Sequence, residues 1–135
     1  MSTIIPDETV KDIIRYRKYI KHDIVINDLP VSDDGRYRMK SFDLDCDKYI
    51  CKMVIRQNTD RLDNFSIILV YKDPLIGDVS VMRFNGNHGR HKNRIEGNVI
   101  SGPHIHLMTE RYQKHTTHPD GYAEPTGYTA VFRKL

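Results

Sequence analysis

The spacing of apolar residues predicts one helix near the start of the chain. In residues 7–22 they recur at the three- and four-residue intervals that bring side chains to one side of a helix: Val10, Ile13, Ile14 and Ile20. Acidic residues occupy the first turn and basic residues the last, which complements the helix dipole. Asp7 or Thr3 is placed to cap the N-terminus. We therefore expect an amphipathic helix that packs against a sheet.

Several short segments after this helix have the length and apolar character of β-strands. They lie at 23–30, 36–45, 49–57, 65–71, 79–84, 104–109 and 127–133, with turn-forming residues between them. A change of alternation in the second segment predicts a bulge near residues 40–42. The order predicts an α+β fold: the N-terminal helix packed on an antiparallel sheet of about five or six strands. A long loop rich in His and Gly, residues 85–102, precedes a late strand.

Length and composition indicate one globular domain spanning residues 1–135, because 39% hydrophobic and 29% charged residues are ordinary proportions for that class. No apolar run approaches the roughly 20 residues needed to cross a bilayer. The first residues lack the basic and apolar regions of a secretory signal. We therefore expect a cytoplasmic protein without membrane association. Cys46 and Cys51 are the only cysteines, and their spacing favours free, buried thiols.

Histidines are concentrated in one stretch, residues 84–112, which holds four of the seven in the chain. They form two spaced pairs, His88 with His91 and His104 with His106. In a strand, residues 104 and 106 lie on one face with Cα atoms about 6.6 Å apart, while the apolar residues between and after them lie on the other. We expect the apolar face to be buried, so the two imidazoles would point into a cleft or solvent.

The net charge of +3 is unevenly distributed along the chain. Residues 83–135 carry eight Lys and Arg against four Asp and Glu, and no acid lies between Asp78 and Glu96. A basic, histidine-rich half favours an anionic partner, either RNA or another phosphate-bearing ligand.

The leading hypothesis is cleavage of RNA without a metal ion or other cofactor. Two histidines that titrate near neutrality can act as general acid and base, and cations can stabilise the phosphorane. The candidate catalytic residues are His88, His91, His104 and His106. The candidate phosphate-binding residues are Arg90, Lys92, Arg94, Arg111 and Tyr112.

Two other hypotheses remain open. In one, the chain is a binding module without turnover that contacts a protein or a nucleic acid; a homodimer is also compatible with the sequence. In the other, zinc is bound, and the ligands would be His88, His91, His104 and His106. Their spacing matches no standard zinc signature, and the surrounding cations oppose a second positive charge.

The arrangement NGNHGRHKN, followed by GPHIHLMTERY and GYTAVF, resembles an uncharacterised family of small bacterial and prophage proteins over residues 80–132. The resemblance implies a bacterial or phage setting and a defence or toxin–antitoxin context, and it assigns no catalytic residues. PHIHL also resembles the alternating histidines of the histidine-triad nucleotide hydrolases, but Met108 stands where that motif has its third histidine.

Overall fold

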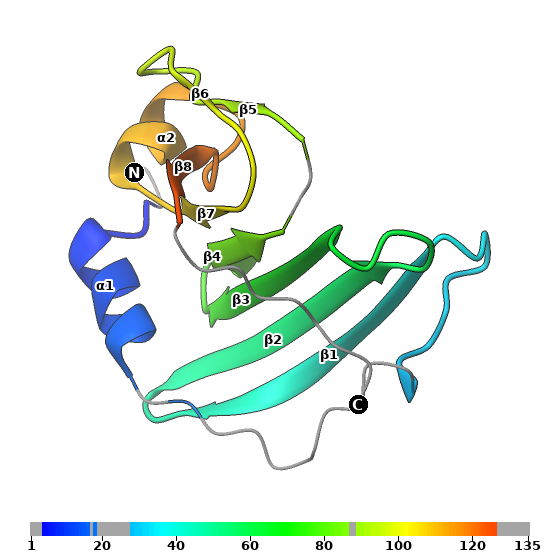
Figure 1. Ribbon diagram of the computed structural model, residues 1–135. Coiled ribbons are helices and arrows are strands. Elements are labelled where there is room, and N and C mark those ends of the chain that lie inside the picture. The colour runs from blue at the N-terminus through cyan, green and yellow to red at the C-terminus, as the bar shows by residue number, and fades with distance from the viewer. Residues whose placement is uncertain (1–3, 17, 19–27, 87–88, 127–135) are drawn as a thin grey trace.

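The computed structural model describes residues 4–16, 18, 28–86 and 89–126 (Figure 1). The expected α+β architecture is confirmed, because these residues form a helix near the N-terminus and a six-stranded antiparallel sheet in the order β1-β2-β3-β4-β7-β8. A separate two-stranded sheet pairs β5 with β6. The elements are α1 (Asp7–Arg15), β1 (Tyr37–Cys46), β2 (Tyr49–Asn58), β3 (Phe65–Asp73), β4 (Gly77–Asn85), β5 (His91–Lys92), β6 (Val99–Ile100), β7 (His104–Leu107), α2 (Glu110–His115) and β8 (Tyr122–Pro125).

The first four strands form an antiparallel meander of long hairpins, and the later elements gather at one end of it. After β4 the chain leaves the sheet to form the β5–β6 hairpin, and it returns as β7 beside β4. Figure 1 shows β5, β6, α2 and β8 grouped near β7, while β1 to β3 extend away from them. This grouping places short segments over one end of the sheet.

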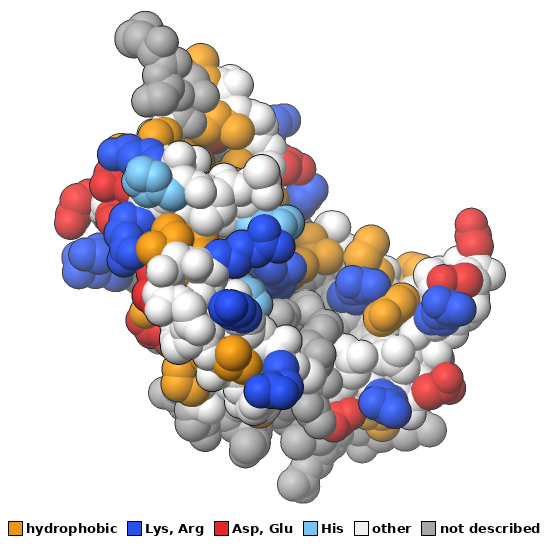
Figure 2. Space-filling model, turned by 90° about the horizontal axis from the view of Figure 1, so that it is seen from above, with side chains coloured by type: hydrophobic (Ala, Val, Ile, Leu, Met, Phe, Trp, Pro, Cys, Tyr) orange, Lys and Arg blue, Asp and Glu red, His pale blue; other side chains and the backbone are white. Residues whose placement is uncertain are grey.

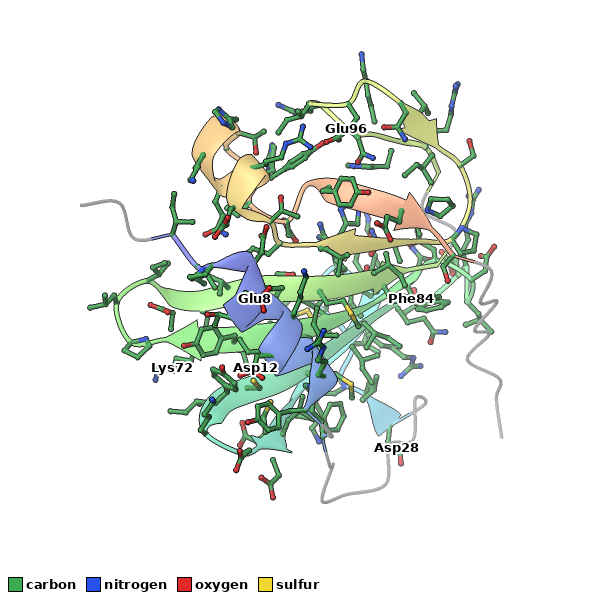
Figure 3. All side chains as sticks on the ribbon, turned by 90° about the vertical axis from the view of Figure 1, so that its left-hand side faces the viewer. Glu8, Asp12, Asp28, Lys72, Phe84 and Glu96 are labelled. Atoms are coloured by element: carbon green, nitrogen blue, oxygen red, sulfur yellow. The ribbon has the colours of Figure 1, made fainter. Side chains whose placement is uncertain are left out.

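Helix α1 covers one face of the sheet and supplies much of the main core. Val10 and Ile13 are buried against a cluster that includes Leu69 and Val81. Burying such a side chain contributes about 1.5–3 kcal/mol. The Tyr49 hydroxyl donates a 2.6 Å hydrogen bond to Asp12 of the helix. Figure 3 is viewed from the side of α1 and shows the helix lying in front of the strands.

The helix is shorter than the sequence predicts, since it ends at Arg15 and Tyr16 is extended, with φ −60° and ψ 131°. Its N-cap is Pro6, which makes no capping side-chain hydrogen bond. Asp7 does not cap α1, and its carboxylate instead accepts a 2.8 Å hydrogen bond from the backbone N–H of Glu110. A contact between the two helices therefore takes the place of a cap by Asp7, while Thr3, the other expected cap, lies outside the described residues.

The bulge predicted near residues 40–42 is wrong, because β1 and β2 pair without interruption from Tyr37 to Cys46. Residues 39–41 of β1 are exposed, with Met39 at 52%, so the apolar residue there does not mark a buried face. The irregularity lies instead between β3 and β4, after Leu69.

Four elements were not predicted from sequence: helix α2, strand β8 and the two strands of the β5–β6 hairpin. The end of α2 and strand β8 fall within residues 114–125, which were expected to form a polar loop, and the β5–β6 hairpin occupies part of the expected loop at 85–102. The Thr109 hydroxyl caps α2 by accepting from the backbone N–H of Tyr112 at 3.2 Å. Most of the segment 23–30, and all of 127–133, lie outside the described residues. None of the helices that the structure describes is both long and apolar enough to cross a bilayer.

Candidate functional site

Two rows of polar side chains cross the face of the sheet that is turned away from α1. One row runs through Arg56, Ser66, Asn85 and His104, which are paired in register from β2 to β3, β4 and β7. In the neighbouring row Arg83 of β4 is paired with His106 of β7. Side chains on one face of paired strands lie within contact distance, so the antiparallel register brings these residues together.

These rows form the floor of a pocket of about 640 Å³. The segment through β5 forms one wall with Arg90, His91, Lys92 and Arg94. The segment between α2 and β8 forms another, with Thr116, His118, Asp120 and Gly121. In Figure 2, Lys and Arg side chains gather around exposed histidine atoms. The pocket therefore joins segments that are far apart in the sequence.

Three of the four candidate histidines meet in this pocket. The ring centroid of His91 lies 4.5 Å from that of His106 and 5.6 Å from that of His104, and the last two are 4.9 Å apart. The rings of His104 and His106 share a face, as expected from strand periodicity. His88 lies outside the described residues.

The strand pair lines a pocket, which was one of its two expected positions, but it is buried rather than exposed to solvent. His104 is only 2% exposed and His106 only 4%, whereas the alternate residues Ile105 and Leu107 are half-buried. The reason is the cover over this face, since β5 and the segment before β8 lie against the imidazoles.

Backbone carbonyls determine which nitrogen carries the hydrogen in each ring of the pair. Nδ1 of His104 lies 2.8 Å from the Gly102 carbonyl oxygen, and Nδ1 of His106 lies 2.9 Å from that of Asp120. A carbonyl oxygen only accepts, so both Nδ1 atoms are protonated. The two Nε2 atoms then face each other at 3.1 Å. Neutral rings would oppose two lone pairs there, so this contact becomes a hydrogen bond only when the pair holds one extra proton.

His91 has the opposite arrangement. Its Nε2 donates to the Gly121 carbonyl oxygen at 2.7 Å. The neutral ring therefore has its lone pair on Nδ1, where it can accept a proton.

The environment of the strand pair disfavours its protonation. Burial, followed by the charges of Arg83 and His91, lowers the pKa of His106 to about 4. Burial is also the main cause of the lowered pKa of His104. A bound anion would act in the opposite direction, because a nearby negative charge favours the protonated ring.

A network of hydrogen bonds connects the pair to the neighbouring strands. The Ser66 hydroxyl donates to Asn85 Oδ1 at 2.8 Å, and Asn85 Nδ2 lies 3.4 Å from His104 Nε2. Arg83 Nη2 forms a 3.2 Å ion pair with Asp120, while the buried Nε of Arg83 has no hydrogen-bond partner among the described residues. The only carboxylate of the lining is therefore already paired.

The candidate phosphate-binding residues divide into two groups. Arg90, Lys92 and Arg94 line the pocket and form no ion pair within the described part of the chain. Arg111 does not line it, and its guanidinium lies 3.3 Å from a Glu96 oxygen. Tyr112 lines the pocket but is 2% exposed, and its hydroxyl donates to Glu96 at 2.6 Å.

Several lining residues were not among the sequence-based candidates: Arg56, Ser66, Arg83, Asn85, Thr116, His118, Asp120 and Gly121. Strand alternation places residues 83 and 85 on one face of β4. It does not show that they lie beside His104 and His106, because that depends on the pairing of β4 with β7. Histidine spacing alone does not contain that information.

Within the described residues, no group of three or more His, Cys, Asp or Glu side chains is arranged to hold a metal ion. Comparisons of the chain with protein-family models, with curated proteins and with solved structures found no match.

Proposed function

We propose that the protein binds RNA in this pocket and cleaves it by acid–base catalysis without a metal ion. The observation that carries the proposal is the meeting of three imidazoles with a strongly basic lining. The cations are Arg56, Arg83, Arg90, Lys92 and Arg94, and the single acid, Asp120, is paired with Arg83. Guanidinium groups bind phosphate oxygens in a bidentate manner, so this lining suits a phosphodiester.

The two kinds of histidine fit the two proton transfers of RNA cleavage. Nδ1 of His91 is the base that takes the proton of the 2′-hydroxyl. The 2′-oxygen then bonds to phosphorus, and the bond from phosphorus to the 5′-oxygen breaks. The protonated pair of His104 and His106 gives its shared proton to that leaving oxygen. The products are a 2′,3′-cyclic phosphate and a 5′-hydroxyl, and the lining cations stabilise the phosphorane charge.

Substrate binding allows the pair to take up from water the proton that this mechanism needs. Burial and Arg83 lower the pKa of His106, so without a neighbouring anion the pair is neutral near pH 7. A phosphodiester beside the pair offsets the positive charge and raises the pKa. The acid therefore forms when RNA binds.

Binding without turnover is the second candidate function, and one observation favours it. Both Nδ1 atoms of His104 and His106 donate to backbone carbonyls, and both Nε2 atoms lie within the buried pair, 3.1 Å apart. In that role the buried pair is structural, and the pocket only holds a nucleic acid or the anionic surface of a protein.

A comparison of RNA with DNA tests the proposal and separates the candidates. Labelled single-stranded RNA and DNA of one sequence are incubated with the protein in EDTA, and binding and fragments are measured. We expect both to bind and only RNA to be cut, because DNA lacks the 2′-hydroxyl. RNA that is bound and stays intact would favour the binding function. Absence of binding to either would contradict both, and cleavage only after metal is restored would favour the metal hypothesis.

A further inference from the structure

A second pocket of about 510 Å³ adjoins the first. It is lined by Arg94 and Ile95 after β5, and by Lys114, His115, Thr116 and Thr117 at the end of α2. Arg94 and Thr116 line both pockets, so the two form one continuous surface.

The chemistry of this second pocket also suits a polyanion. No acid is among its lining residues, and neither Arg94 nor Lys114 forms an ion pair within the described part of the chain. Glu96, the acid closest in sequence to Arg94, is held by the Tyr112 hydroxyl and by Arg111. Figure 3 shows Glu96 on the part of the molecule that contains β5, β6 and α2. The positive charge of the second pocket is therefore available to a ligand.

Tyr112 holds both sides of this surface in place. Its hydroxyl accepts a 3.3 Å hydrogen bond from the backbone N–H of Ile95. Its carbonyl oxygen accepts from the Thr116 hydroxyl at 2.8 Å and from the Thr116 backbone N–H at 3.1 Å. A surface held in this way is largely formed before a ligand arrives, which lowers the entropy cost of binding.

We infer that the ligand is a single-stranded RNA chain that runs from the first pocket across Arg94 into the second. This inference rests on the proposed function and names its substrate class: an oligonucleotide rather than a mononucleotide. Arg94 and Lys114 bind successive backbone phosphates. The exposed ring of His115 and the side chain of Ile95 provide a surface for a base or sugar, a contact that does not depend on sequence.

The test is the length dependence of RNA binding to wild type, Lys114→Gln and Lys72→Gln, measured by fluorescence anisotropy. Lys72 is exposed on β3, away from Glu96 in Figure 3, so its replacement is a control with the same change of net charge. For wild type we expect an RNA octamer to bind more tightly than a dinucleotide. Lys114→Gln should weaken octamer binding by about three- to tenfold and should leave dinucleotide binding unchanged. It should also reduce the slope of log affinity against log salt by about 0.7, the value for one phosphate of a single strand.

Two outcomes would overturn the inference, and they differ in what they mean for the proposed function. Equal affinities for the dinucleotide and the octamer, with Lys114→Gln no different from Lys72→Gln, would overturn only the extended site. Absence of binding to either RNA would overturn the proposed function as well.

Discussion

Replacement of His91 by Gln is expected to lower the rate of RNA cleavage by about 10²- to 10⁴-fold, the range for loss of a general base. The neutral His91 ring has its lone pair on Nδ1, because its Nε2 donates to the Gly121 carbonyl oxygen. The Gln side chain retains an N–H donor for that carbonyl and has no group that titrates near neutrality. The measurement is the single-turnover rate of cleavage of labelled RNA.

RNA affinity and the thermal unfolding midpoint of the His91→Gln variant provide the control. Both should stay close to wild type, since the lining cations and the hydrogen bond to Gly121 are retained. A cleavage rate near that of wild type would exclude His91 as the base. A lower rate that is explained by weaker binding alone would assign this residue to substrate binding.

Acidification of the ligand-free protein is expected to destabilise it well before most carboxylates titrate. His106 has an ordinary pKa of 6.5 when unfolded and about 4 when folded, so the unfolded state takes up a proton first as the pH falls. The stabilisation from the neutral folded ring is complete above pH 6.5 and is lost as the pH falls towards 4. The loss is about 3 kcal/mol in total, of which about 2 kcal/mol falls between pH 7 and pH 5. The pKa of His104 is also lowered, so it adds to the loss.

Urea unfolding at a series of pH values measures this loss, and His106→Asn is the matched variant. The Asn side chain can still donate to the Asp120 carbonyl oxygen but does not titrate. The variant should therefore show a flatter dependence of unfolding free energy on pH. If it does not fold, the NMR titration of the His106 ring in wild type gives the same information. An unshifted ring pKa, or an equal pH dependence in both proteins, would contradict the buried, neutral pair.

The parts of the fold that follow from local pattern could be predicted from the sequence. Alternation and turn residues located β1 to β4, and the apolar stripe located α1. The end of α1 could not be predicted from the apolar stripe. Tyr16 lies beyond the helix but still packs against the core, as Ile14 does within the last turn. Helix α2 was missed because its six residues, ERYQKH, are polar except for Tyr112, and its start depends on Thr109 and on the contact with Asp7.

The candidate site shows the same division between local and long-range information. Strand periodicity predicted that His104 and His106 share a face, and composition identified the basic segment that includes His91. Burial of the pair depends on the segments that cover β7, and the inclusion of Arg83 depends on the pairing of β4 with β7. These contacts join residues remote in sequence, and single-residue patterns do not specify them.

The most direct test of the central claim uses a DNA oligonucleotide that contains one ribonucleotide, incubated with the protein in EDTA. The proposed mechanism predicts one cut, immediately 3′ to the ribonucleotide, which leaves a 2′,3′-cyclic phosphate on one fragment and a 5′-hydroxyl on the other. A 2′-O-methyl version should bind and stay intact, and His91→Gln purified in parallel controls for contaminating nucleases. A bound substrate that is not cut, or cuts at positions without a 2′-hydroxyl, would contradict acid–base cleavage of RNA by the histidines of this pocket.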